Sequence, residues 1–79
     1  MSKILEMRQK RADLWDKAKA FLDEHEGENG LMSAEDTEEY ERMEQEVADM
    51  GHAIERLERA AQLDKEMNEA AGPVLAGQP

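Results

Sequence analysis

The feature that most constrains the fold is a strict alternation of three- and four-residue steps between apolar residues in the middle of the chain. This seam consists of Tyr40, Met43, Val47, Met50, Ile54 and Leu57. Such spacing keeps an apolar stripe on one side of a helix and is typical of a coiled coil. β-branched residues are sparse and no proline precedes Pro73, so strands have little support. The sequence therefore predicts an all-α protein.

An earlier apolar stripe occupies the segment from about residue 2 to about residue 26. Arg11 fills the one step of this stripe where an apolar residue is missing. The stripe consists of Ile4, Met7, Leu14, Ala18 and Phe21, and an adjoining row consists of Leu5, Ala12, Trp15 and Leu22. Together they predict a first helix with a broad apolar face rather than a narrow seam.

Turn signals separate the two stripes. Gly27, Asn29 and Gly30 are residues that adopt the left-handed conformations needed to end a helix and turn the chain. Ser33, followed three residues later by Asp36, is a helix N-cap signature. We therefore predict a loop over residues 27–32 and a second helix over about residues 33–71. The Gly72–Pro73 pair predicts the end of that helix, with residues 72–79 as a linker-like tail.

The two predicted helices differ in length. At 1.5 Å per residue, the first is about 37 Å long and the second about 58 Å. Folded back, the first helix reaches only about Ile54 or Leu57, so about fifteen residues of the second helix overhang. Beyond Leu57 the seam changes phase and continues through Ala60, Leu63, Met67 and Ala70. We predict one domain over residues 1–71, an antiparallel helical hairpin with a longer, coiled-coil-like second helix. We expect it to self-associate through Leu57, Leu63 and Met67.

We expect the two helices of the hairpin to meet through six large side chains. These are Leu14, Trp15, Phe21, Tyr40, Met43 and Val47. For Trp15, packing near Tyr40 and Met43 is preferred to an exposed binding role. Gly51, beside the seam, costs about 1 kcal/mol relative to alanine in a helix interior. It indicates either a close approach between helices or a hinge.

The charge of the chain is strongly negative and unevenly spread. Twenty acidic and ten basic residues give a net charge of −10. Residues 1–22 carry +3, residues 23–50 carry −11 and residues 51–79 carry −2. The basic first segment should attract the acidic second one. So acidic a chain would repel phosphate, and we expect no nucleic-acid partner. No apolar run approaches the roughly 20 residues that span a bilayer, so we expect no membrane partner.

Residues for catalysis or ligand binding do not converge in the sequence. No cysteine is present, which excludes disulfides and zinc–thiolate sites. His25 and His52 fall on different predicted helices, and His52 with Glu55 is a lone pair at one-turn spacing. A calcium-binding loop started at Glu24 would place Asn29 where a glycine is needed. We predict a non-enzymatic protein with no catalytic residues, no cofactor and no metal site.

Two stretches of the chain carry a family resemblance. The leader "KILEMRQKRADLWDKAKAFL" is followed by "ENGLMSAEDTEEYERMEQEVADMGHAIERLER". These stretches resemble the N-terminal scaffolding (delta) domain of tailed-bacteriophage major capsid proteins of the Hong Kong ninety-seven type. The resemblance rests on the leader, the loop-to-helix junction, Tyr40 in the seam and the closing "IERLER". The resemblance covers roughly residues 1–63.

This resemblance implies a function. In that family the domain precedes the shell-forming fold, directs procapsid assembly from the inside and is removed by a phage maturation protease. It implies the capsid shell domain, the protease and other copies of the chain as partners. It also places the protein in the host cytoplasm, inside the procapsid. The alternative from the residues themselves is a free-standing acidic coiled-coil regulator or inhibitor that binds a basic partner.

Overall fold

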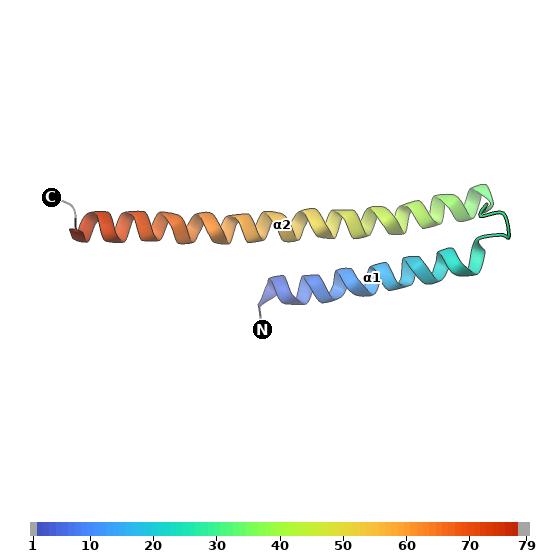
Figure 1. The fold of residues 1–79 in the computed structure, drawn as a ribbon, viewed down its shortest axis with the longest axis horizontal. Helices are drawn as coiled ribbons and strands as arrows, with labels where there is room; N and C mark the ends of the chain where they lie inside the picture. Colours follow the sequence, from blue (N-terminus) through green and yellow to red (C-terminus); the bar gives the residue numbers. More distant parts are fainter. Residues whose placement is uncertain (1, 78–79) are drawn as a thin grey trace.

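The chain forms an elongated hairpin of two helices. The computed structural model describes residues 2–77, with side chains described as far as Glu69. Helix α1 spans Lys3–His25 and helix α2 spans Ala34–Gly77, and the two lie antiparallel with α2 extending well past the start of α1 (Figure 1). The molecule measures 71 × 22 × 16 Å. The predicted all-α, coiled-coil-like helical hairpin with a longer second helix is confirmed.

Side-chain caps set the starts of both helices. The Ser2 hydroxyl accepts a hydrogen bond from the Leu5 amide at 3.1 Å, and the Ser33 hydroxyl accepts one from the Asp36 amide at 3.1 Å. Each bond satisfies an amide that has no carbonyl partner within its helix. The carboxylates of acidic residues in the first turns, including Glu35 and Asp36, also interact favourably with the positive ends of the helix dipoles.

The loop between the helices is held by its own backbone. The Gly27 amide donates to the Leu31 carbonyl at 2.9 Å, and the Gly30 amide donates to the Gly27 carbonyl at 2.9 Å. The Asn29 side chain accepts a bond from the Leu31 amide at 3.1 Å. Gly30 has a φ of 77°, a left-handed conformation that glycine adopts without steric cost. These bonds reverse the chain over a short distance and set α2 beside α1.

The far end of α2 differs from the sequence prediction. The helix continues through Gly72 and Pro73 to Gly77, whereas the sequence predicted an end at about residue 71 and a linker-like tail over residues 72–79. A proline removes one backbone donor and strains the turn before it. The flanking residues keep their own donors, so a helix can bridge that single gap. The last two residues of the predicted tail, 78 and 79, lie outside the described part of the chain.

The core of the hairpin is small. Among the described residues, the buried apolar side chains are Ala18, with no exposed surface, and Ile54, which is 6% exposed. Gly51 is also buried, and α2 is helical on both sides of it. The helix is therefore continuous at Gly51. A core of this size is marginal for a chain of 79 residues.

We predict that Ser33→Ala destabilises the hairpin by about 1 kcal/mol, because the Asp36 amide loses its partner at the start of α2. Ser33→Asp is the matched control, since its carboxylate also caps a helix. Urea unfolding followed by circular dichroism measures both variants. Equal stabilities of Ser33→Ala and Ser33→Asp would contradict a capping role for Ser33.

Candidate interaction surface

The six predicted packing residues lie along the hairpin but are not equally covered. Five of them are half-buried: Leu14, Phe21, Tyr40, Met43 and Val47. Trp15 keeps 38% of its surface exposed. The ammonium group of Lys19 lies 5.9 Å from the centre of the Trp15 ring, within the range of a cation–π contact. Trp15 is therefore at the margin of the interface rather than inside it.

Arg11 crosses from α1 to the backbone of α2. Its Nε donates a hydrogen bond to the Val47 carbonyl at 2.9 Å. A Cβ atom at Gly51 would lie 2.6 Å from the Arg11 Nη2 atom, which is too close. The absence of a side chain at Gly51 therefore makes room for the Arg11 guanidinium against α2. This is a close approach, one of the two interpretations of Gly51 offered by the sequence.

A groove runs along the hairpin beside this contact. Its lining includes Ala12 and Trp15 from α1 and Ala48, Gly51 and Ile54 from α2. The small residues leave the groove open, and the Trp15 ring forms part of its apolar wall. Charged side chains, Arg8 and Glu55 among them, complete the lining. Sequence reasoning did not find this groove, although the apolar row containing Ala12 and Trp15 was its signal.

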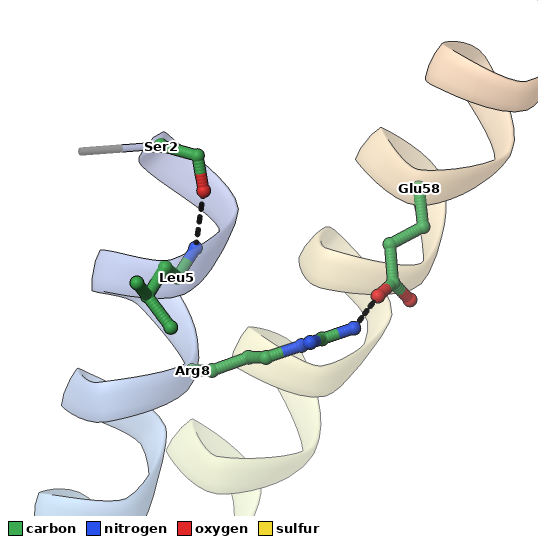
Figure 2. Close-up of polar contacts among 4 residues, drawn as sticks. All are labelled: Ser2, Leu5, Arg8 and Glu58. Atoms are coloured by element: carbon green, nitrogen blue, oxygen red, sulfur yellow. Dashed lines mark hydrogen bonds and ion pairs between the residues drawn. The ribbon is translucent and has the colours of Figure 1, made fainter.

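The covered part of α2 ends near Glu58. The Arg8 guanidinium of α1 forms an ion pair with the Glu58 carboxylate, and Arg8 lies nearly two turns after the Ser2 cap of α1 (Figure 2). Both side chains are substantially exposed, at 58% and 39%, so the pair contributes under about 1 kcal/mol. Its importance is positional, because it shows which part of α2 lies beside the beginning of α1.

Beyond Glu58, α2 has no cover from α1. Every side chain from Arg59 to Glu69 is exposed. Leu63 is 49% exposed and Met67 is 63% exposed. We call residues 59–77 of α2 the overhang. Leu57, the third residue expected to join copies, is half-buried and lies before the overhang.

Tyr40 illustrates how the acidic face of α2 affects a titratable group. Its hydroxyl donates a hydrogen bond to the Glu44 carboxylate at 3.1 Å. Burial raises the pKa of Tyr40 above its ordinary value, and the bond to Glu44 and the negative charge of Glu44 raise it further. All three causes favour the neutral phenol.

The two histidines of the described chain lie on different helices, His25 on α1 and His52 on α2. The His25 ring stacks on Phe21 with centroids 4.0 Å apart, and its Nδ1 lies 2.9 Å from the Phe21 carbonyl. His52 is exposed and lines the groove. Within residues 2–77 no group of three or more histidine and acidic side chains is placed to hold a metal ion. No helix in that range is long and apolar enough to cross a membrane.

No protein family, curated protein or solved structure matches the chain.

We predict that Gly51→Ala and Arg11→Ala are coupled. Alanine in place of Gly51 gains about 1 kcal/mol of helix propensity, but in the parent protein its Cβ displaces the Arg11 guanidinium. With Arg11 already replaced by alanine, the gain should be realised in full. A double-mutant cycle of unfolding free energies measures the coupling. An equal effect of Gly51→Ala in both backgrounds would rule out the Arg11 contact.

We predict that Glu44→Ala lowers the pKa of Tyr40, because the hydrogen bond and the nearby negative charge are removed. The pKa should stay above its ordinary value, since burial, the largest cause, remains. Tyr40 is the single tyrosine of the chain, so the phenolate absorbance reports it directly. Glu41→Ala removes a neighbouring carboxylate as a control and should leave the pKa of Tyr40 unchanged. An unchanged titration in Glu44→Ala would contradict the contact.

Proposed function

We propose that this protein is a non-enzymatic assembly domain whose copies associate through the overhang of α2. The single observation that carries this proposal is the exposure of Leu63 and Met67 on the part of α2 that α1 does not cover. Large apolar side chains left open on one side of a helix favour burial against a partner.

The size of the core supports a need for such a partner. Ala18 and Ile54 are the buried apolar side chains of the described hairpin, so folding alone removes little apolar surface from water. Small helical proteins with cores of this kind are commonly stabilised by association. Pairing of the overhangs would bury Leu63 and Met67 and stabilise α2 at the same time.

The charge of the chain supports reversible association. Each copy carries −10, so copies packed closely repel one another, and the repulsion is greatest at low salt. An apolar contact opposed by this repulsion gives weak association that can later be undone. A temporary scaffold needs association that is weak and that can be reversed.

We extend the proposal to a particular class of scaffold on the strength of the sequence resemblance. The leader, the loop junction and the seam around Tyr40 resemble the scaffolding domain of tailed-bacteriophage major capsid proteins. In this proposal the domain directs procapsid assembly inside the shell, in the host cytoplasm, and a maturation protease removes it. We expect the reading frame of the gene to continue past Pro79 into a β-rich shell domain, and a stop codon there would contradict this part of the proposal.

We predict that the parent protein gains mass with concentration in analytical ultracentrifugation, and that Leu63→Asp abolishes this gain. The substituted carboxylate would have to be buried in the contact, which is costly. Leu31→Asp is the matched control, because Leu31 is 68% exposed and lies in the loop. It should associate like the parent.

Both substitutions fall at exposed positions, so circular dichroism should show the same helix content in each. A parent protein that stays monomeric at high concentration would overturn the proposed self-association. The same holds if Leu63→Asp and Leu31→Asp associate equally well.

A specific observation favours a second candidate function, that of an acidic regulator bound to a basic partner. Four glutamates line an open depression at the start of α2, with Arg42 beside them: Glu35, Glu38, Glu39 and Glu41. A regulator of this kind would act as a monomer through that surface. Tight binding of a polylysine peptide by monomeric Leu63→Asp, lost when these glutamates are replaced by glutamine, would favour this alternative.

A further inference from the structure

The exposed apolar residues of the overhang define a seam separate from that of the hairpin. Ala60, Leu63 and Met67 follow one another at steps of three and four residues, and all three are exposed. The phase change after Leu57 rotates this seam away from the side of α2 that faces α1. A second helix can therefore approach the overhang without displacing α1.

Charged residues flank the new seam. With Ala60 and Met67 at heptad position a and Leu63 at position d, both Arg59 and Glu66 fall at position g, and Asp64 falls at position e. Charges at e and g set the partner and the orientation of a coiled coil. In an antiparallel pair g lies beside g of the other helix, whereas in a parallel pair g lies beside e.

The distribution of charge along the molecule distinguishes the two orientations. Residues 1–57 carry −8 and residues 58–79 carry −2. A parallel pair would place the two acidic hairpins side by side at about 8–10 Å, the spacing of packed helices. An antiparallel pair centred near Gln62 places residues such as Glu41 of the two copies about 60 Å apart along the axis. That separation far exceeds the screening length of about 8 Å at physiological salt.

One antiparallel register pairs the flanking charges and sets apolar side chains opposite each other at its centre. With Ala60 of one copy opposite Leu63 of the other, a small side chain meets a large one, which suits close packing. Arg59 then lies beside Glu66 of the second copy, and the two-fold symmetry repeats this ion pair. Shifting the register by one heptad, so that Met67 meets Leu63, brings the two Glu66 carboxylates together instead.

We infer that the overhang is an antiparallel dimerisation site for a second copy of this chain, with Arg59 paired to Glu66 of that copy. This inference rests on the proposed self-association and adds its orientation and register. The site joins two copies through the first part of their overhangs, so that residues 65–69 of each copy lie alongside residues 54–58 of the other and the loop ends of the two hairpins point away from each other. An elongated dimer of this kind, with one hairpin loop at each end, can connect two shell subunits.

The inference is tested by exchanging charges and measuring dimer dissociation constants by sedimentation equilibrium. Arg59→Glu and Glu66→Arg should each weaken the dimer about tenfold, since each turns two attractive exposed pairs into repulsive ones. The double variant Arg59→Glu/Glu66→Arg should return to within about twofold of the parent, because the pairs are restored with their signs reversed.

Arg59→Glu/Asp64→Arg is the matched control. It has the same net charge as the other double variant and restores the flanking pair only in a parallel dimer. We expect it to remain weakened. Restoration by this control, without restoration by Arg59→Glu/Glu66→Arg, would overturn the antiparallel orientation. Equal association of all variants would overturn the Arg59 contact while leaving self-association intact, and absence of association in the parent would overturn the proposed function itself.

Cysteine cross-linking gives a second measurement, because the chain has no cysteine of its own. In the inferred register residue 67 lies beside Arg56 of the second copy, so Met67→Cys should not form a disulfide-linked dimer under mild oxidation. A mixture of Ala60→Cys and Leu63→Cys proteins should form the mixed disulfide in preference to either homodimer. Efficient cross-linking of Met67→Cys to itself would establish the parallel arrangement and contradict the inference.

Discussion

The apolar contact between α1 and α2 is the interaction on which the rest of this structure depends. It encloses Ala18 and Ile54 and half-buries a row of larger side chains. Its extent is limited by the shorter helix, because α1 has 23 residues and α2 has 44. α1 therefore covers about 35 Å of a helix of about 66 Å. The uncovered remainder of α2 is a direct consequence of this difference in length.

Electrostatics refine this arrangement rather than produce it. Arg8 and Arg11 reach from the more basic helix to a carboxylate and to a backbone carbonyl of α2. Both contacts lie at exposed side chains, where solvent screening keeps their contribution small. They nevertheless act in the same direction as the apolar stripe, since each is made only when the two helices lie antiparallel in this register. The remaining negative charge faces solvent and opposes close packing of many copies.

Most of the fold could be predicted from local patterns. The seam at Tyr40, Met43 and Val47, the loop around Gly30 and the Ser33 cap depend on residues close together in sequence, and all appear in the structure. The end of α2 was predicted wrongly, because Gly72 and Pro73 are helix-breaking signals by propensity alone and the helix continues through them. In the sequence, Arg11 interrupts the apolar stripe of the first helix. Its role became evident only when α1 and α2 were set side by side.

The sequence by itself determined that this chain forms two helices of unequal length joined by a tight loop. That information is local, because helical periodicity, caps and turn residues act within a few positions of one another. The difference in helix length also predicted that Leu63 and Met67 lie past the end of α1, where both are exposed. The tertiary structure alone decided that Leu57 is half-buried and that Trp15 stays at the rim of a groove. Exposure depends on where the end of one helix falls along the other, and that placement results from the packing of side chains distant in sequence.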